Sequence, residues 1–341
     1  MSEISIIIPH HNGYEILNNC INFLYKSDLY DSEIIIVNNN STDNSINQII
    51  IDFPNIIILN LNGNRGYAGG CNYGAKHANG ELLVFLNNDT EVSKNWLTEL
   101  INIINKDSTI SSVQSKILNK KNNEKFDYAG ASGGFIDKYC YPFTRGRIFD
   151  SIEQDIGQYE DVIKIFWASG TGFITKKTIF EELGGFDERF FAHMEEIDYH
   201  WRCQLNGYSI YVNPKSIIYH LGGGTLSYNS PYKTYLNHRN SLLLLLSNYN
   251  LLNTMKFFIP RLIMELISTI KDIITLRPAH SFAQIKALIW IFVHPNIIIN
   301  KRAQIKKIRK VTDNEMLHNI IFNKSIVYQY FVNNKKKYSN L

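Results

Sequence analysis

The sequence predicts an α/β fold with a mainly parallel central sheet, followed by a helical C-terminal region. Strand and helix signals alternate over residues 1–90, and this alternation is typical of a parallel sheet covered by helices. Beyond Tyr232 the alternation stops, and leucine, isoleucine and basic residues dominate. We therefore expect an α/β domain at residues 1–230 and a helical, basic region at residues 231–341.

The first expected strand, residues 4–8, is a β-branched run that ends at Pro9, as in a buried parallel strand. Further strands are expected at residues 33–37, 56–61 and 82–86. Apolar residues at helical spacing predict helices at residues 16–24, 46–50, 68–78 and 96–104. Ser41, Thr42 and Asp43 are expected to cap the second of these helices, and Ser93 the fourth.

The middle of the chain carries weaker signals. Residues 119–165 are polar, aromatic and weakly periodic, so we expect a loop-rich segment there. Order is expected to return at residues 166–175, followed by a short helix that ends at Leu183-Gly184-Gly185 and a second helix at residues 194–206. Two short strands are expected at residues 208–212 and 217–220.

Composition is that of a globular protein, with 341 residues of which 45% are hydrophobic. The four cysteines are scattered and form no Cys-x-x-Cys pair, so the sequence indicates neither a zinc knuckle nor a disulfide framework. The amino terminus has no basic run before its short apolar stretch, so we expect a cytoplasmic protein. No nucleic-acid-binding signature is present, and no nucleic-acid partner is expected.

Two features of the C-terminal region leave its partner open. Basic residues cluster there, namely Lys301, Arg302, Lys306, Lys307, Arg309, Lys310 and Lys335 to Lys337. They form either a solvated helix face or a contact for an anionic membrane surface. Arg261, Glu265, Ser268 and Asp272 draw a narrow polar stripe on an otherwise apolar helix. That helix would pack on the main domain, on a second copy in a homodimer, or peripherally on the inner face of the cytoplasmic membrane.

Polar clusters follow the four expected strands, at the sheet edge where parallel sheets bind ligands. They are His10-His11-Asn12-Gly13, residues 38–43, residues 64–70 and Asn87-Asn88-Asp89. The glycine-rich cluster has neither the P-loop nor the dinucleotide-binding spacing. Gly69 and Gly70 would still let backbone amides approach a phosphate, and Arg65 would add a bidentate contact.

The ordered set of motifs resembles family 2 glycosyltransferases of the GT-A fold, a Rossmann-like fold. The early motifs are Ser-Ile-Ile-Ile-Pro-His-His-Asn, Val-Asn-Asn-Asn-Ser-Thr-Asp, Asn-Arg-Gly-Tyr-Ala-Gly-Gly and Leu-Asn-Asn-Asp-Thr. The later ones, Leu-Gly-Gly-Phe-Asp-Glu-Arg-Phe-Phe, Met-Glu-Glu-Ile-Asp and His-Leu-Gly-Gly-Gly-Thr, resemble the rhamnosyltransferase-like branch. The resemblance covers residues 2–227.

The resemblance implies a role for each matching residue on the donor side. Donor-binding positions are Pro9, His11, Asn12, Asn38, Asn39, Arg65, Gly66, Asn87 and Asn88. Asp89 takes the last place of the family's Asp-x-Asp metal motif, whose first place is Asn87 here. His220, just before Gly222-Gly223-Gly224, matches the family's late histidine and is the expected second ligand of Mn²⁺ or Mg²⁺.

On the acceptor side, a base must remove a hydroxyl proton as the oxygen attacks the anomeric carbon from the face opposite the phosphate. Glu195, Glu196 and Asp198 lie within one helical turn, and crowded carboxylates raise one another's pKa. The resemblance places the base in the paired acids, with Glu196 as first choice and Glu195 as second.

The leading hypothesis is therefore an inverting glycosyltransferase of surface polysaccharide synthesis. It would move a sugar from a nucleotide-diphosphate sugar, with dTDP-rhamnose as the branch suggests, to a glycan or lipid-linked acceptor. The alternative is a catalytically inactive sugar-nucleotide or glycan-binding protein of the same fold, which the missing first aspartate favours. A Rossmann dehydrogenase is a third hypothesis.

Overall fold

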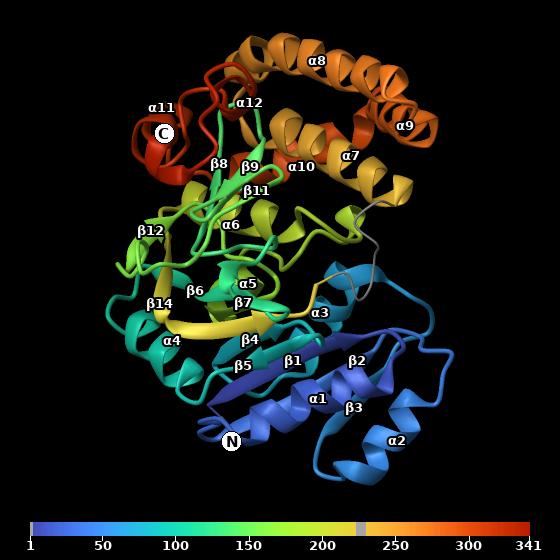
Figure 1. Cartoon of the computed structure of the whole chain (residues 1–341), viewed down its shortest axis with the longest axis vertical. Coiled ribbons are helices and arrows are strands. Elements are labelled where there is room, and N and C mark those ends of the chain that lie inside the picture. Colours follow the sequence, from blue (N-terminus) through green and yellow to red (C-terminus); the bar gives the residue numbers. More distant parts are fainter. Residues whose placement is uncertain (1–2, 223–229) are drawn as a thin grey trace.

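The computed structural model describes residues 3–222 and 230–341, so Gly223 and Gly224 of the last motif lie outside the described residues. Its central sheet has the strand order β12-β14-β6-β13-β4-β1-β2-β3 (Figure 1). The parallel half comprises β1 (Ile4–His10), β2 (Ser32–Asn38), β3 (Ile57–Asn60) and β4 (Leu82–Leu86). The predicted α/β fold with a mainly parallel sheet is thus confirmed.

The remaining strands extend the sheet from β4. They are β13 (Gly172–Lys176), β6 (Ile110–Asn119), β14 (Ser209–His220) and β12 (Ile163–Ile165). Of these, β13 runs antiparallel to β4 and β6, whereas β14 runs parallel to β6. Two short strands, β5 (Thr90–Val92) and β7 (Asn122–Phe126), pair with β14 and β6.

Helices cover both faces of the sheet because successive strand residues point to opposite sides. Ile6 and Ile8 of β1 pack with α1 (Tyr14–Tyr25), α2 (Ser45–Asp52) and α4 (Trp96–Ile104). Ile7 packs on the other side, with α3 (Gly66–His77), α5 (Lys177–Glu182) and α6 (Glu195–Asn206). The loops at the carboxyl ends of the strands are thereby held between two packed layers.

The expected helix caps differ from those observed. The Asp43 carboxylate accepts hydrogen bonds from the backbone N–H groups of Ser45 and Gly13, so it joins the start of α2 to the loop after β1. Ser93 was expected to cap α4, but the residue before that helix is Asn95, and no side chain caps it. Instead, the carbonyl oxygen of Ser93 accepts a hydrogen bond from the backbone N–H of Trp96.

The expected loop-rich middle segment, residues 119–165, also contains short strands that the sequence did not predict. Residues 134–152 form a second sheet, with the order β11-β10-β9-β8: β8 (Gly134–Ile136), β9 (Pro142–Thr144), β10 (Arg147–Ile148) and β11 (Ser151–Ile152). Phe126 belongs to one buried apolar cluster of this segment, and Phe143 and Ile148 belong to another, which includes Ile326 of the C-terminal region. The two short strands expected at residues 208–220 are one strand, β14, with an irregularity between Asn213 and Ile217.

The C-terminal region is helical, as expected. It contains α7 (Pro231–Asn248), α8 (Leu251–Ile274), α9 (Pro278–Val293), α10 (Pro295–Ile308), α11 (Asp313–Asn319), α12 (Ile326–Phe331) and the short helix η2 (Tyr338–Asn340). Four consecutive leucines of α7, Leu242–Leu245, share a buried cluster with Trp201 of α6. Helices α8 and α9 lie at the end of the molecule farthest from α1 and α2 (Figure 1).

Within the described residues no single helix has the length and apolar composition of a membrane span. Helices α9 and α10 taken together, with a bend of 69° between them, have the length and composition of a span, but on these two criteria alone.

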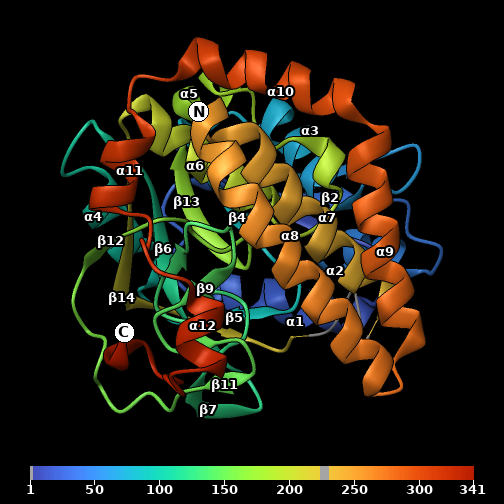
Figure 2. The ribbon, with the colours of Figure 1, turned by 90° about the horizontal axis from the view of Figure 1, so that it is seen from above.

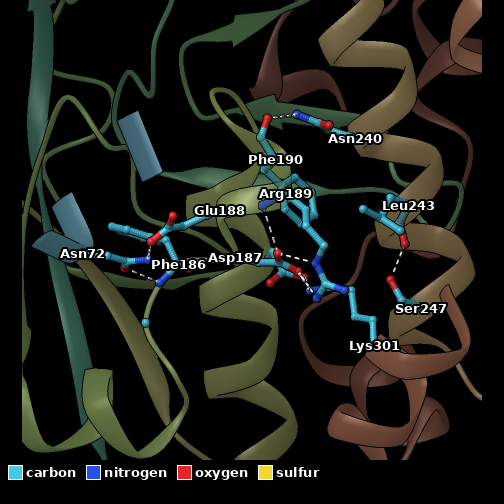
Figure 3. Close-up of polar contacts among 12 residues, drawn as sticks. Asn72, Phe186, Asp187, Glu188, Arg189, Phe190, Asn240, Leu243, Ser247 and Lys301 are labelled. Carbon is cyan, nitrogen blue, oxygen red and sulfur yellow. Dashed lines mark hydrogen bonds and ion pairs between the residues drawn. The ribbon is translucent and has the colours of Figure 1, made fainter. Parts of the chain in front are cut away.

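A buried lysine of α10 ties the C-terminal helices to the α/β domain. The Lys301 ammonium lies 2.8 Å from a carboxylate oxygen of Asp187 and 2.8 Å from one of Asp198, and its side chain is 3% exposed. Figure 3 shows Asp187 beside Lys301 and Arg189, and the Arg189 guanidinium makes two hydrogen bonds of 2.7 Å to the same carboxylate. Burial opposes the charge of Asp187, but Lys301 and Arg189 hold its pKa well below the ordinary value.

We predict that Lys301→Met lowers the free energy of unfolding by about 3–5 kcal/mol, because it leaves two buried carboxylates without a shared cation. Urea denaturation followed by circular dichroism measures the change. Lys306→Met, at an exposed position of the same helix, is the matched control and should change stability little. Equal effects of the two variants would contradict a bridging role for Lys301.

Candidate functional site

A cavity of about 1740 Å³ opens at the carboxyl ends of the parallel strands and continues along the C-terminal helices. Most site residues expected from the sequence line it: Pro9, His11, Asn39, Gly66, Asn87, Asn88, Asp89, Glu195, Glu196 and His220. Four others, Asn12, Asn38, Arg65 and Asp198, do not line it. The structure therefore brings the two expected halves of the site, donor side and acceptor side, to one cavity.

Asn39 organises the donor side of this cavity. Its buried side chain donates to the carbonyl oxygen of Gly66 (2.9 Å) and accepts a hydrogen bond from the backbone N–H of Arg65 (2.8 Å). These two bonds hold the loop after β3 beside the end of β2. Arg65 itself points elsewhere, since its guanidinium pairs with Glu188 at 2.5 Å.

His10 fixes the orientation of Asn88 on the same side. Burial lowers the pKa of His10 to about 4, so the ring is neutral at pH 7. Its Nδ1 lies 2.8 Å from the Asn88 amide nitrogen, and its Nε2 lies 3.0 Å from the Ser45 hydroxyl. A neutral ring that accepts from Asn88 and donates to Ser45 satisfies both contacts. The amide of Asn88 is thereby positioned at the cavity wall.

Asn12 and Asn38 have local roles that their motifs did not reveal. The Asn12 side chain accepts from the backbone N–H of Thr42 (2.7 Å) and donates to its hydroxyl (3.2 Å). Asn38 accepts from the backbone N–H of Ser41 (2.9 Å) and donates to Asn60 (2.8 Å). Both asparagines shape the loops that carry lining residues rather than line the cavity themselves.

Gly66 is the one position of the glycine-rich loop where the backbone demands glycine. Its φ is +69°, and a Cβ there would lie 2.2 Å from the carbonyl oxygen of Phe191. Gly69 and Gly70 were expected to bring amides close to a phosphate, but neither lines the cavity. A Cβ on Gly70 would lie 3.1 Å from Cβ of Pro9, so Gly70 allows α3 to pack closely on β1.

Asp89, His220 and Asp127 form a buried row at the centre of the site. His220 Nε2 lies 3.1 Å from Asp89 Oδ1, and His220 Nδ1 lies 2.9 Å from Asp127 Oδ1. Burial opposes a charge on the ring, but the hydrogen bonds and charges of the two carboxylates outweigh it and raise the pKa of His220 to about 10.

This row fits a divalent cation in its donor set. A histidine that ligates a metal commonly donates its second ring N–H to a carboxylate, and Asp127 occupies that position at His220 Nδ1. Nε2 and the Asp89 carboxylate then face the same point, an oxygen and imidazole pair that suits Mn²⁺. In residues 3–222 and 230–341 no three His, Cys, Asp or Glu side chains are placed to hold one metal ion together, so Asp89 and His220 would need further ligands, such as the oxygens of a bound phosphate.

The Glu195 and Glu196 carboxyl groups lie at the start of α6, behind an unusual loop. Phe191, His193 and Met194 all have positive φ values, of 64°, 66° and 75°, in conformations that are rare for residues other than glycine. One oxygen of each glutamate is buried, and among the described residues neither of these oxygens has a hydrogen-bond partner. Burial, with the charge of Glu196, raises the pKa of Glu195, and burial raises that of Glu196 to about 7.

Asp198, the third expected carboxylate, lies away from the cavity. Its fully buried side chain is held by Arg202 at 3.0 Å and Lys301 at 2.8 Å, and it accepts a hydrogen bond from Asn248. All of these partners lie within the protein, and the side chain does not reach the cavity. The structure therefore separates Asp198 from the pair that the sequence grouped it with.

Sequence reasoning missed several lining residues, all close to Asp127. Arg147 stacks on the Tyr128 ring at 3.8 Å, and its guanidinium donates to the Tyr128 carbonyl oxygen (2.8 Å). Lys233 of α7 lies 5.5 Å from the same ring. All three line the cavity. Asp127, Tyr128 and Arg147 fall in the segment expected to be loop-rich, and no motif marked them.

We predict that Gly66→Ala lowers the free energy of unfolding by about 1–3 kcal/mol, because the backbone conformation and the Phe191 carbonyl oxygen both oppose a Cβ. Gly63→Ala is the control, since Gly63 also has a positive φ, of +105°, but nothing within 4 Å of the added atom. Thermal or urea unfolding measures both variants. A loss no larger for Gly66→Ala than for Gly63→Ala would contradict the close approach of Phe191.

Comparisons with known proteins identify relatives in glycan synthesis. Residues 5–184 match glycosyl transferase family 2. The O-antigen biosynthesis protein RfbC of Myxococcus xanthus is 28% identical over 64% of this chain, which spans only 17% of that protein. The low-salt glycan biosynthesis hexosyltransferase Agl10 of Haloferax volcanii is 26% identical over 71% of this chain and 75% of its own. The dTDP-rhamnosyl transferase RfbF of Shigella flexneri is 22% identical, covering 72% and 80%.

Solved structures share the fold. GalNAc-T7, solved with UDP, GalNAc and Mn²⁺, superposes with a TM-score of 0.57 at 18% identity, over 72% of this chain and 47% of its own. The mannosyltransferase PcManGT of Pyrobaculum calidifontis, solved with GDP-Man and Mn²⁺, gives 0.52 at 12% identity, covering 90% and 85%. The expected GT-A fold is confirmed, and with the match over residues 5–184 the chain belongs to glycosyl transferase family 2.

Proposed function

We propose that this chain is an inverting glycosyltransferase that moves a sugar from a nucleoside-diphosphate donor to a glycan or lipid-linked acceptor in surface polysaccharide synthesis. The observation that carries the proposal is that one cavity is lined both by the Asp89–His220 pair and by the Glu195–Glu196 pair. The first pair suits a diphosphate with its cation, and the second suits a base.

The donor side would hold the nucleoside through the ends of β1 and β2. Pro9, His11 and Asn39 line this part of the cavity, and Asn88 is oriented by His10. The name of RfbF favours dTDP-rhamnose as the donor, and this is the sugar nucleotide we propose first. Asn12, Asn38 and Arg65 would contribute by holding the loops that carry the lining residues.

Asp89 and His220 would hold a divalent cation, Mn²⁺ or Mg²⁺, with Asp127 orienting the histidine ring. When bound, such an ion neutralises the charge of the departing nucleoside diphosphate. Asn87, which takes the place of the motif's first aspartate, lines the cavity beside them and offers an amide oxygen instead of a charge. The protein therefore brings one carboxylate to the ion where the family pattern has two.

Glu196 is the proposed base. It lines the cavity, its pKa is raised to about 7 by burial, and one of its oxygens lacks a partner within the described residues. It would accept the proton of the acceptor hydroxyl as that oxygen attacks the anomeric carbon opposite the leaving phosphate. Attack from that face inverts the configuration. Glu195, which is more deeply buried, is the second candidate, and Asp198 is not proposed because it does not line the cavity.

A catalytically inactive binding protein remains the alternative proposal, because Asn87 supplies no charge where the family motif has its first aspartate. Such a protein would bind the sugar nucleotide without releasing the nucleoside diphosphate. A Rossmann dehydrogenase is no longer a candidate, since the chain belongs to a glycosyltransferase family.

We predict that Asp89→Ala abolishes sugar transfer and removes the thermal stabilisation that the donor gives in the presence of Mn²⁺, because the diphosphate loses its cation. Differential scanning fluorimetry with a panel of sugar nucleotides, dTDP-rhamnose first, measures the shift with and without Mn²⁺. Asp150→Ala, at another acidic position of the same cavity, should keep the shift. An unchanged shift in Asp89→Ala would count heavily against the proposed cation site.

We predict that Glu196→Gln lowers the transfer rate by about 10²–10⁴-fold while donor binding persists, because only the base is lost. In the unaltered protein the rate should rise with pH and level off above the raised pKa of Glu196, about 7, since a base acts when deprotonated. Glu195→Gln should keep that rise. If Glu195→Gln were the inactive variant and Glu196→Gln the active one, the base would be Glu195.

A further inference from the structure

Helix α8 presents its polar residues to the protein and its apolar residues to the outside. The buried positions include Arg261, Glu265, Thr269 and Asp272, which recur at steps of three and four. The exposed positions lie on the opposite face and include Leu252, Met255, Ile259, Leu266, Ile270 and Ile274. A helix on the surface of a globular protein shows the reverse arrangement.

The buried polar side chains of α8 form hydrogen bonds and ion pairs inside the protein. Arg261 donates to Glu265 (2.8 Å), to the Ser241 hydroxyl of α7 (2.7 Å) and to the Tyr139 carbonyl oxygen (2.6 Å). Glu265 also pairs with His238 of α7. These bonds determine which side of α8 faces inward, so the outward position of its apolar side chains is specified by the fold. The polar stripe seen in the sequence is the inner face of the helix.

Neighbouring elements extend this apolar surface. Phe282, Ile285, Ile289 and Phe292 of α9 are exposed, as are Phe331 at the end of α12 and Val332 after it. Seen from above, α8, α9 and α12 lie on the side of the molecule that faces the viewer (Figure 2). We call these exposed apolar residues of α8, α9 and α12, with Val332, the apolar face. Exposed apolar side chains that gather on one side of a protein usually mark a surface that binds a partner or a membrane.

The exposed charges of α8 and α9 have one sign. Residues 251–293 are described throughout, and their only acidic residues, Glu265 and Asp272, are buried. Four basic residues of the same stretch are exposed: Lys256, Lys271, Arg277 and Lys286. Exposed apolar side chains bordered by cations match the chemistry of an anionic lipid surface, whose acyl chains and phosphates they would meet together.

The cavity reaches the apolar face between α8 and α12. Ile263 and Ile267 of α8 line it on one side, and Phe331 and Val332 line it on the other, with Lys271 and Lys324 among the lining residues. The Lys271 ammonium lies 5.5 Å from the Phe331 ring. The same cavity reaches Glu196 and Asp89 at the strand ends. Its outer part is thus apolar with cations, and its inner part holds the proposed chemistry.

We propose that the apolar face inserts into an anionic bilayer, and that the cavity receives from that bilayer an amphiphilic acceptor whose lipid part stays between α8 and α12. The acceptor clause rests on the proposed function. With α8 lying in the membrane plane, its exposed side chains would enter the boundary between head groups and acyl chains, about 5–10 Å deep. The cations would contact lipid phosphates, and the acceptor hydroxyl would reach Glu196 through the cavity.

The charge pattern disfavours a second copy of the chain as the occupant. In a two-fold dimer the same surface patch meets itself, so the exposed lysines and arginine of one copy would border those of the other. Like charges held together across an interface oppose association. An anionic bilayer meets the same cations with the opposite sign.

Vesicle flotation tests the insertion. The protein should float with vesicles of phosphatidylcholine and phosphatidylglycerol, less with phosphatidylcholine alone, and less at high salt. Ile259→Gln/Leu266→Gln/Ile270→Gln should lower the vesicle partition coefficient on the order of tenfold or more. The matched control Ile50→Gln/Ile51→Gln/Ile156→Gln changes three exposed isoleucines away from the apolar face and should float unchanged. Equal flotation of the two triple variants would overturn the proposal.

Site-specific labelling tests the cavity mouth. All four native cysteines are buried, so an environment-sensitive fluorophore can be attached selectively to Ile259→Cys, Val332→Cys or the control Ile51→Cys. Anionic vesicles should shift the emission of the first two to the blue and leave the third unchanged. Flotation without a shift at Val332→Cys would overturn the route from the bilayer, and a concentration-dependent shift without vesicles would assign the apolar face to a second copy.

A separate measurement, of sugar-nucleotide binding, tests the proposed function. Thermal stabilisation by sugar nucleotides with Mn²⁺ should be the same in the α8 triple variant and in the unaltered protein. If no sugar nucleotide stabilised either protein, the proposed function would fail while the flotation result stood.

Discussion

The ammonium group of Lys301, buried between Asp187 and Asp198, is the interaction on which the arrangement of the site depends. Asp198 belongs to the first turn of α6, which also carries Glu195 and Glu196, and Asp187 precedes the loop that leads to them. One cation of α10 therefore holds the C-terminal helices against the part of the α/β domain that carries the proposed base. A charge buried this deeply is tolerated only because both carboxylates are paired, so the helices and the loop adopt one relative position.

Because of this contact, the C-terminal helices form one wall of the cavity and are not a separate domain. With α7 packed on α6, the polar residues of α8 find partners on α7, and the apolar residues of α8 are left outside. The outward position of the apolar side chains of α8 therefore follows from the packing of α8 on α7. Two buried sets of ion pairs, the Lys301 bridge and the Arg261–Glu265 pair, hold α10 against α6 and the polar side of α8 against the protein.

The parts of the fold that the sequence predicted are those whose signals are local. The helices of residues 14–104 each bury one face, so the spacing of their apolar residues marked them, whereas strands such as β1 are buried on both faces and continuous β-branched runs marked them. Strand β6 was missed because Ser112, Gln114 and Ser115 are fully buried in it, and their hydroxyl and amide groups bond to distant partners. Asp89 and Glu196, which both line the cavity, were predicted because Asp89 lies in a polar cluster after a strand and Glu196 in a paired-acid motif at a helix start. Asp127 was not, since its role depends on His220, 93 residues away.

The central claim, that the shared cavity releases a nucleoside diphosphate by sugar transfer, is tested most directly with the unaltered protein. It would be incubated with a panel of sugar nucleotides, Mn²⁺ and vesicles made from a bacterial lipid extract, while free nucleoside diphosphate is measured. The account predicts release from one donor, a stop on chelation of the metal, and a sugar recovered on lipid with inverted configuration. Saturable binding of a sugar nucleotide without any release would contradict it and identify a binding protein.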